Sequence, residues 1–251
     1  METLPYQRKE VIGAATLYLG DCLQVLPALG RFDHAIFDPP YESLTHAAKN
    51  SKKGRKHRND GVAELKGLDF APIDAIRDDV VRIVGAASMG WFIAFCTPEG
   101  VRAWADSINA SPLRYKRACV WVKPDSTPQL NGQGPAQGAE NFVCAWAGDG
   151  FARWNAGGKR GVYTHCVNNS ERQGIHPTEK PRRLMSELIA DFTCRGETII
   201  DPFMGSGTTG VAAVMADRSF VGIEQNADYF DIACRRIEDA QRQGNLFGVS
   251  S

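Results

Sequence analysis

The sequence predicts one α/β domain over residues 1–251, built on a mostly parallel sheet with helices on both faces. Two observations carry this prediction. Short apolar segments alternate with helical patterns along most of the chain, as expected of strand–helix–strand units. The segments at residues 35–37 and 198–200 each run directly into a polar or glycine-rich turn, which is where parallel sheets place their binding sites.

Each expected element rests on a local pattern. Apolar stretches predict strands at residues 16–19, 35–37, 91–96, 118–122, 142–147, 198–200 and 220–223. Apolar residues at helical spacing predict helices over residues 73–84 and 181–192, and Asn226 is a suitable N-cap for a last helix. Two stretches, residues 42–70 and 148–174, show no sustained period and are expected to be loops.

Composition excludes several classes of protein. The chain has no formal net charge, so its overall charge does not indicate a nucleic-acid-binding protein. Its seven cysteines include no Cys-x-x-Cys pair, so we expect neither a disulfide framework nor a metal site. No apolar run is long enough to cross a membrane, and the polar N-terminus lacks the apolar centre of a signal peptide. We therefore expect a cytoplasmic protein without membrane association.

A glycine-rich turn follows one of the predicted strands. Gly205, Gly207 and Gly210 match the pattern G-x-G-x-x-G, in which the backbone closely approaches a nucleotide-like ligand at a helix N-terminus. Glu224 ends the next predicted strand, where a carboxylate can accept hydrogen bonds from ribose hydroxyls. Threonines stand where a phosphate-binding loop would have its lysine, which argues against a nucleoside triphosphate.

A second turn carries the residues that we expect to be catalytic: Asp38, Pro39, Pro40 and Tyr41. The prolines cannot continue a sheet, so they direct Asp38 and Tyr41 outward at the carboxyl end of their strand. The Asp38 carboxylate and the Pro39 carbonyl can each accept a hydrogen from an exocyclic amino group of a DNA base. This draws the nitrogen toward the geometry needed to attack a methyl group, and it stabilises developing positive charge. Tyr41 offers a ring on which the base can stack.

The cysteines argue against a different methyl transfer, at carbon 5 of cytosine. That reaction uses a cysteine nucleophile, which usually follows a proline, and no cysteine of this chain does. The amino group is therefore the expected target, and Asp38 rather than a serine at the head of the tetrapeptide favours adenine over cytosine.

Together these motifs resemble the permuted, beta-group DNA amino-methyltransferases, in which the catalytic tetrapeptide precedes the cofactor loop. Residues 38–41 resemble the catalytic motif, residues 176–181 the stretch before the cofactor strand, and residues 201–210 the cofactor loop. The resemblance implies a seven-stranded, Rossmann-like sheet with a circularly permuted motif order. It also implies S-adenosylmethionine as the cofactor and a target base flipped out of double-stranded DNA.

The resemblance assigns roles to particular residues. The cofactor-binding residues would be Asp21, Lys180, Asp201, Pro202, Phe203, Gly205, Ser206, Gly207, Thr208 and Glu224. Asp21 would lie near the adenine of the cofactor and Lys180 near its methionine end. An exposed lysine at a helix start is the other interpretation of Lys180. The oligomeric state, a homodimer included, and a cognate restriction endonuclease stay open as partners.

The two irregular segments are candidates for DNA contact, as insertions at residues 43–70 and 148–174. The first contains Lys52, Lys53, Arg55, Lys56 and Arg58, which we expect to contact phosphates without reading sequence. The second contains a smaller basic patch: Arg153, Lys159 and Arg160.

Three alternatives remain at this point. The first is methylation of the cytosine amino group by the same chemistry. The second is an NAD-dependent oxidoreductase that uses the glycine-rich turn, although so little chain follows Glu224 that the sheet would have to be completed by the preceding residues. The third is a catalytically inactive DNA-binding module, for which the intact tetrapeptide would have no use.

Overall fold

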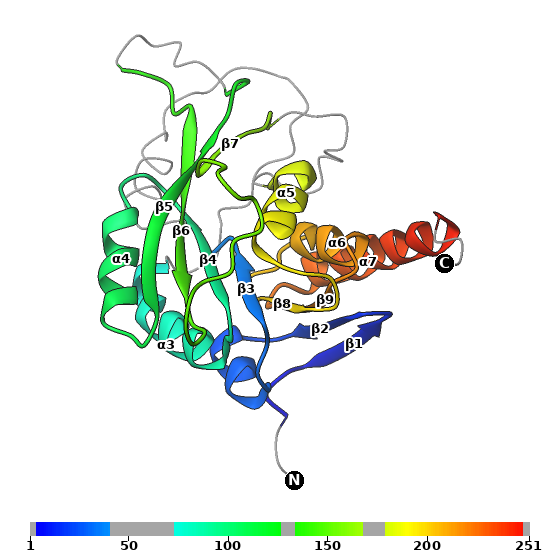
Figure 1. The fold of residues 1–251 in the computed structure, drawn as a ribbon. Coiled ribbons are helices and arrows are strands. Elements are labelled where there is room, and N and C mark those ends of the chain that lie inside the picture. The colour runs from blue at the N-terminus through cyan, green and yellow to red at the C-terminus, as the bar shows by residue number, and fades with distance from the viewer. Residues whose placement is uncertain (1–3, 41–72, 127–133, 168–178, 248–251) are drawn as a thin grey trace, which may run out of the picture.

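The computed structural model describes residues 4–40, 73–126, 134–167 and 179–247. Within these ranges the chain forms a central sheet flanked by helices on both faces (Figure 1). Tyr41 and the basic cluster of residues 52–58 lie outside the described residues, so their predicted roles stay predictions.

The described strands form one nine-stranded sheet in the order β1-β2-β9-β8-β3-β4-β6-β5-β7. Strands β2, β9, β8, β3 and β4 are parallel neighbours, and β1 and β6 are antiparallel to the strands beside them. The predicted, mostly parallel sheet is therefore confirmed. The strands are β1 (Arg8–Ile12), β2 (Ala15–Leu19), β3 (His34–Phe37), β4 (Trp91–Cys96), β5 (Arg114–Val122), β6 (Ala139–Trp146), β7 (Val162–Thr164), β8 (Thr198–Asp201) and β9 (Ser219–Glu224).

Helices cover the two faces of the sheet as two groups (Figure 1). Buried side chains of α5, α6 and α7 share one apolar cluster with the sheet, and those of α1, η1, α3 and α4 share the other. The helices are α1 (Cys22–Val25), α3 (Arg77–Ala87), α4 (Val101–Asn109), α5 (Arg182–Phe192), α6 (Thr208–Met215) and α7 (Ala227–Phe247), with 3-10 turns η1 (Leu26–Ala28) and η2 (Ile73–Ala75).

Strand β4 contributes side chains to the apolar clusters on both faces of the sheet. Alternate side chains of a strand point to opposite faces. Trp91, Ile93 and Phe95 accordingly join the cluster under α5, and the residues between them join the cluster under α3 and α4. All six residues of β4 are buried, which is why its sequence is an unbroken apolar run.

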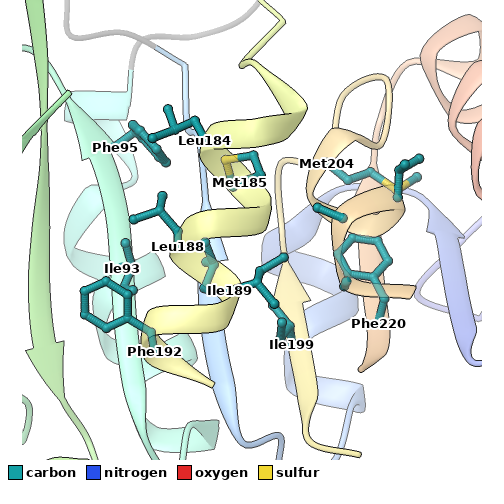
Figure 2. Close-up of a cluster of buried hydrophobic side chains, with 14 of the residues drawn as sticks. Ile93, Phe95, Leu184, Met185, Leu188, Ile189, Phe192, Ile199, Met204 and Phe220 are labelled. Carbon is teal, nitrogen blue, oxygen red and sulfur yellow. The ribbon is translucent and has the colours of Figure 1, made fainter. Parts of the chain in front are cut away.

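Helix α5 packs along its whole length against the sheet (Figure 2). Its sequence places Leu184, Met185, Leu188, Ile189 and Phe192 at helical spacing, and all five side chains are buried. Each such side chain contributes about 1.5–3 kcal/mol relative to an exposed position. The helix is thereby held firmly over β3, β4 and β8, and the residues just before it are fixed near the ends of those strands.

The sheet has nine strands where the resemblance predicts seven. The two strands absent from the prediction, β1 and β7, lie at the edges of the sheet. Strand β1 is a charged, largely exposed segment, and its pairing with β2 comes from a hairpin at Gly13, whose φ is +53°. The expectation that residues 148–174 are entirely irregular is wrong, because β7 pairs there with β5. Edge strands are commonly short or charged, so their sequences carry little apolar pattern.

Among the described helices, none combines the length and the apolar character that a bilayer span requires.

Candidate active site

The site lies at the carboxyl ends of four neighbouring parallel strands, β2, β9, β8 and β3. Asp21 follows β2, Glu224 ends β9, the glycine-rich turn follows β8, and Asp38 follows β3. Neighbouring strands of a sheet lie about 4.8 Å apart, so the three intervals between these four strands place the groups along roughly 14 Å of one rim. The two predicted motifs, far apart in the sequence, are therefore brought together by the pairing of β3 with β8.

Asp38 stands where a buried strand reaches the surface of this rim. The residues of β3 are fully enclosed, whereas the Asp38 side chain is 28% exposed. Its Oδ2 accepts a hydrogen bond from Lys180 Nζ at 2.7 Å. Burial raises the pKa of Asp38, and the Lys180 ammonium opposes that rise.

Lys180 is a buried lysine, so the alternative of an exposed lysine at a helix start is wrong. Its side chain is 5% exposed, and its Nζ also lies 3.1 Å from Glu140 Oε2. Glu140 is ion-paired through its other oxygen with Lys123. Burial works against the charge of Glu140, but Lys180 and Lys123 lower its pKa to about 2. The Lys180 ammonium is therefore ion-paired with two carboxylates, those of Asp38 and Glu140.

The three glycines of the turn have different tasks. Gly205 has φ +51°, and a Cβ added there would meet nothing within 4 Å. Gly207 has φ +84°, and its Cβ would lie 2.9 Å from the Cβ of Ala233 in α7. A Cβ at Gly210 would lie 2.6 Å from Phe220 in β9. Gly205 thus borders open space, while the other two glycines allow close packing against α7 and β9.

Two acidic residues, Asp201 and Glu224, accept hydrogen bonds from backbone amides of the turn. Asp201 is 2% exposed, and its Oδ1 accepts a hydrogen bond from the amide of Phe203 at 2.9 Å. Burial raises the pKa of Asp201 to about 7. Glu224 accepts from the amide of Gly205 at 2.9 Å and from that of Asn226 at 2.8 Å. Each carboxylate oxygen of Glu224 keeps a further lone pair, which suits it to accept hydroxyl donors of a ribose.

The other residues predicted to bind the cofactor are mostly buried at this turn, and their predicted roles stay predictions. Pro202, Ser206 and Thr208 are buried, and Phe203 is half-buried, with its ring centroid 5.9 Å from that of Phe37. Asp21 caps α1, because its Oδ1 accepts from the amide of Leu23 at 3.0 Å.

Helix α7 locks the turn to the segment before α5. Arg236 donates to the carbonyl oxygen of Ser206 at 2.7 Å and to its Oγ at 2.8 Å. The same guanidinium is ion-paired with Glu179, whose Oε1 also accepts from Thr208 Oγ1 at 3.1 Å. One arginine thus connects the glycine-rich turn, α6 and the approach to α5.

Sequence reasoning missed Glu140, Lys123, Glu179 and Arg236. Glu140 stands opposite Trp121 in the pairing of β6 with β5, next to Lys123. The sequence does show an acid, Glu140, at the start of one apolar strand and a lysine, Lys123, at the end of another. Their partnership depends on strand register, which a single sequence does not specify.

The described part of the second insertion packs on the body of the protein. The Trp154 ring lies 4.8 Å from that of Phe192, and Asn155 Nδ2 donates to the carbonyl oxygen of Thr193 at 2.9 Å. Lys159 is ion-paired with Glu187 at 2.7 Å and with a second carboxylate of α5. Arg153 is ion-paired with Glu197, at the amino end of β8. Two of the three cations in this patch are therefore ion-paired with carboxylates of the protein itself.

Within the described ranges, no group of three or more potential metal ligands occurs.

The fold and the rim together define a class of protein: a Rossmann-like methyltransferase with Asp38 beside a glycine-rich turn. The chain belongs to the N6/N4 DNA methylase family, whose model matches residues 32–235. It is 46% identical to the type II methyltransferase M2.MboI of Moraxella bovis, over 89% of this chain and 87% of that protein. It is 48% identical to M2.DpnII of Streptococcus pneumoniae, over 47% of this chain and 49% of that protein.

Solved structures show the same fold. The complex of M1.HpyAVI with S-adenosylmethionine has a TM-score of 0.66 at 24% identity, covering 88% of this chain and 99% of that one. The cytosine-N4-specific PvuII DNA methyltransferase has a TM-score of 0.69 at 15% identity, covering 95% of this chain and 96% of that one. The family predicted from the motifs is confirmed: the chain is a DNA methyltransferase, and S-adenosylmethionine is its methyl donor.

Proposed function

We propose that the chain transfers a methyl group to the exocyclic amino group of adenine in duplex DNA, after the base has flipped out of the helix. The observation that supports this most strongly is the position of Asp38 on β3, directly beside the turn that follows β8. A methyl donor held at that turn and a base held at Asp38 would meet at one rim. When bound, S-adenosylmethionine supplies an electrophilic methyl group on a sulfonium.

The residues of the chain hold and orient the reacting groups. Gly205 leaves its side of the turn open, and Glu224 accepts ribose hydroxyls. Asp38 Oδ1 and the Pro39 carbonyl accept the two amino hydrogens of the base, which directs the nitrogen lone pair toward the methyl carbon. Methyl transfer to the nitrogen would leave a surplus proton there, which would pass to solvent water. Tyr41 supplies the stacking surface in this proposal.

Flipping the base costs a few kcal/mol, which contacts to the duplex must offset. We propose residues 43–70 for this role, with Lys52, Lys53, Arg55, Lys56 and Arg58 contacting phosphates, and the single domain of residues 1–251 as the functional unit. Action in the cytoplasm and a restriction endonuclease acting on the same site also stay predictions. They are supported by the type II methyltransferases among the relatives.

The test is a product analysis. Purified protein is incubated with unmethylated duplex DNA and S-adenosylmethionine, and the digested DNA is separated into nucleosides. We expect N6-methyl-2′-deoxyadenosine from the wild type, and a loss of at least about a hundred-fold in rate from Asp38→Ala, with cofactor binding retained. N4-methyl-2′-deoxycytidine as the only product would overturn the choice of adenine. An active Asp38→Ala enzyme would overturn the role of Asp38.

A further inference from the structure

Four charged side chains of alternating sign form a row that begins at Asp38. Lys180 Nζ lies 2.7 Å from Asp38 Oδ2 and 3.1 Å from Glu140 Oε2, and Lys123 binds Glu140 Oε1. The four residues come from different parts of the fold: the end of β3, the approach to α5, β6, and the end of β5. Two carboxylates and two ammonium groups leave the row without net charge.

The row is shielded from solvent except at Asp38. The side chains of Lys180, Glu140 and Lys123 are 5%, 8% and 13% exposed, whereas that of Asp38 is 28% exposed. The rings of Phe95 and Trp121 approach the Lys180 ammonium to 5.1 Å and 5.9 Å. Buried charges are tolerated only when paired, so the Lys180 ammonium is held where both carboxylates reach it.

We propose that Glu140 is a positioning residue for methyl transfer: it holds the Lys180 ammonium on Asp38 Oδ2, which leaves Asp38 Oδ1 to accept the amino hydrogen of the target base. This inference rests on the proposed function, since it takes the acceptor role of Asp38 from there. Without Glu140, the ammonium is free to move over the whole Asp38 carboxylate and to compete with the base for both oxygens. Lys123 occupies the second oxygen of Glu140 and fixes its orientation.

The same geometry predicts opposite electrostatic effects of the two neighbours. The charged groups that face Asp38 are Lys180 before α5, Glu140 in β6, Lys123 after β5, and Asp201 at the end of β8. Removing the negative charge of Glu140 lowers the pKa of Asp38, because a like charge is lost. Removing the positive charge of Lys180 raises it, because burial is then less opposed.

The experiment measures kcat/KM for duplex DNA against pH, in the wild type and in Glu140→Gln, Lys180→Met and Lys180→Arg. The acidic limb of this profile reports the acceptor carboxylate in the free enzyme. We expect the limb to move to lower pH in Glu140→Gln and to higher pH in Lys180→Met, and to return toward the wild type in Lys180→Arg. We expect kcat in Glu140→Gln to fall roughly ten- to a hundred-fold, with the Kd for S-adenosylmethionine within about two-fold of the wild type.

Two further variants keep the test decisive. Lys180→Met leaves Asp38 without its ion partner and Glu140 with Lys123 alone. If it does not fold, the double variant Lys180→Met with Glu140→Gln replaces it, and its acidic limb is expected between those of the single variants. Glu10→Gln is the control, because this glutamate is ion-paired with Arg8 on the exposed strand β1.

An unmoved limb in Glu140→Gln overturns the proposal, whether activity is kept or is lost equally at every pH. The second pattern would mean that Glu140 only supports the fold. Failure of the proposed function looks different: the wild type itself would then form methylated cytosine or no methylated base.

Discussion

At the scale of single residues, the most informative contrast is between glycines that look alike in the sequence. Gly205 and Gly207 both have positive φ, but only Gly205 borders open space. Gly207 lies against Ala233 of α7, so its lack of a side chain serves the packing of a helix. The G-x-G-x-x-G pattern thus combines one position that borders open space with two positions at which a side chain would disturb packing.

This contrast predicts that a change to alanine has different effects on cofactor binding and on stability at the two glycines. Gly205→Ala should cost about 1–3 kcal/mol for the left-handed conformation and should weaken S-adenosylmethionine binding more than ten-fold. Gly207→Ala adds about 1–3 kcal/mol of overpacking to that strain, so its unfolding midpoint should fall further. Urea unfolding and calorimetric titration measure the two effects. Cofactor affinity in Gly205→Ala equal to that of the wild type would contradict the assignment.

His34 predicts a pH dependence of stability. The side chain is fully buried, its Nε2 lies 2.8 Å from Glu197, and its Nδ1 accepts from the amide of Trp91 at 2.9 Å. Burial lowers the pKa of His34, so between that pKa and about 6.5 the unfolded chain binds more protons than the folded one. The contribution to stability is therefore complete above about pH 6.5 and is lost as the pH falls below it.

The free energy of unfolding, measured in urea from pH 5 to pH 7, should accordingly rise with pH more steeply in the wild type than in His34→Gln. Parallel curves for the two proteins would show that His34 does not titrate in this range.

At the scale of elements, the sequence predicted the buried strands and the amphipathic helices well, because their patterns follow from burial. Asn226 caps α7 as expected, with its Oδ1 accepting from the amides of Asp228 and Tyr229. The edge strands β1 and β7 were missed, since their pairing is decided by neighbours and not by an apolar pattern. The sequence also placed Asp38 and the glycine-rich turn at the ends of parallel strands, as the structure does. The Glu140–Lys180 contact could not be predicted, because it depends on how β6 and the approach to α5 meet.

Helix α7 supplies a prediction about the cofactor turn. Arg236 binds Ser206 and neutralises Glu179, whose side chain is 6% exposed. Arg236→Met leaves that carboxylate buried without its ion partner, which should destabilise the protein by about 3–5 kcal/mol. The double variant with Glu179→Gln should recover much of this loss, because no buried charge remains. Thermal unfolding of the single and double variants checks the coupling, and additive losses would contradict it.

At the scale of the whole molecule, the charge distribution matters more than the net charge of zero. Lys123, Lys180 and Arg236, the described cations beside the site, are all ion-paired with carboxylates of the protein. Lys159 and Arg153 are paired as well. We therefore expect other cations, those of residues 52–58, to contribute most of the attraction of DNA phosphates.

The salt dependence of DNA affinity tests which cations contact the phosphates. Changing Lys52, Lys53, Arg55, Lys56 and Arg58 to Gln should weaken DNA binding about equally for all sequences. It should also reduce the slope of log K against log salt by up to about 4.5, at about 0.9 per phosphate contact. Lys116→Gln with Arg117→Gln is the matched control, since these exposed residues lie in the half of β5 away from the site. Binding assays across salt concentrations measure the slopes, and equal slopes would exclude residues 52–58.

The adjacency of β3 and β8 has a consequence for synthesis. Well over half of the chain separates Phe37 from Thr198, yet the two strands are hydrogen-bonded neighbours. A ribosome therefore releases β3 long before the strand that covers one of its edges exists, and such distant pairing is slow to form. Until β8 and its turn emerge, a growing chain carries Asp38 without the turn that we propose holds the methyl donor. We therefore expect chains terminated before Thr198 not to methylate DNA.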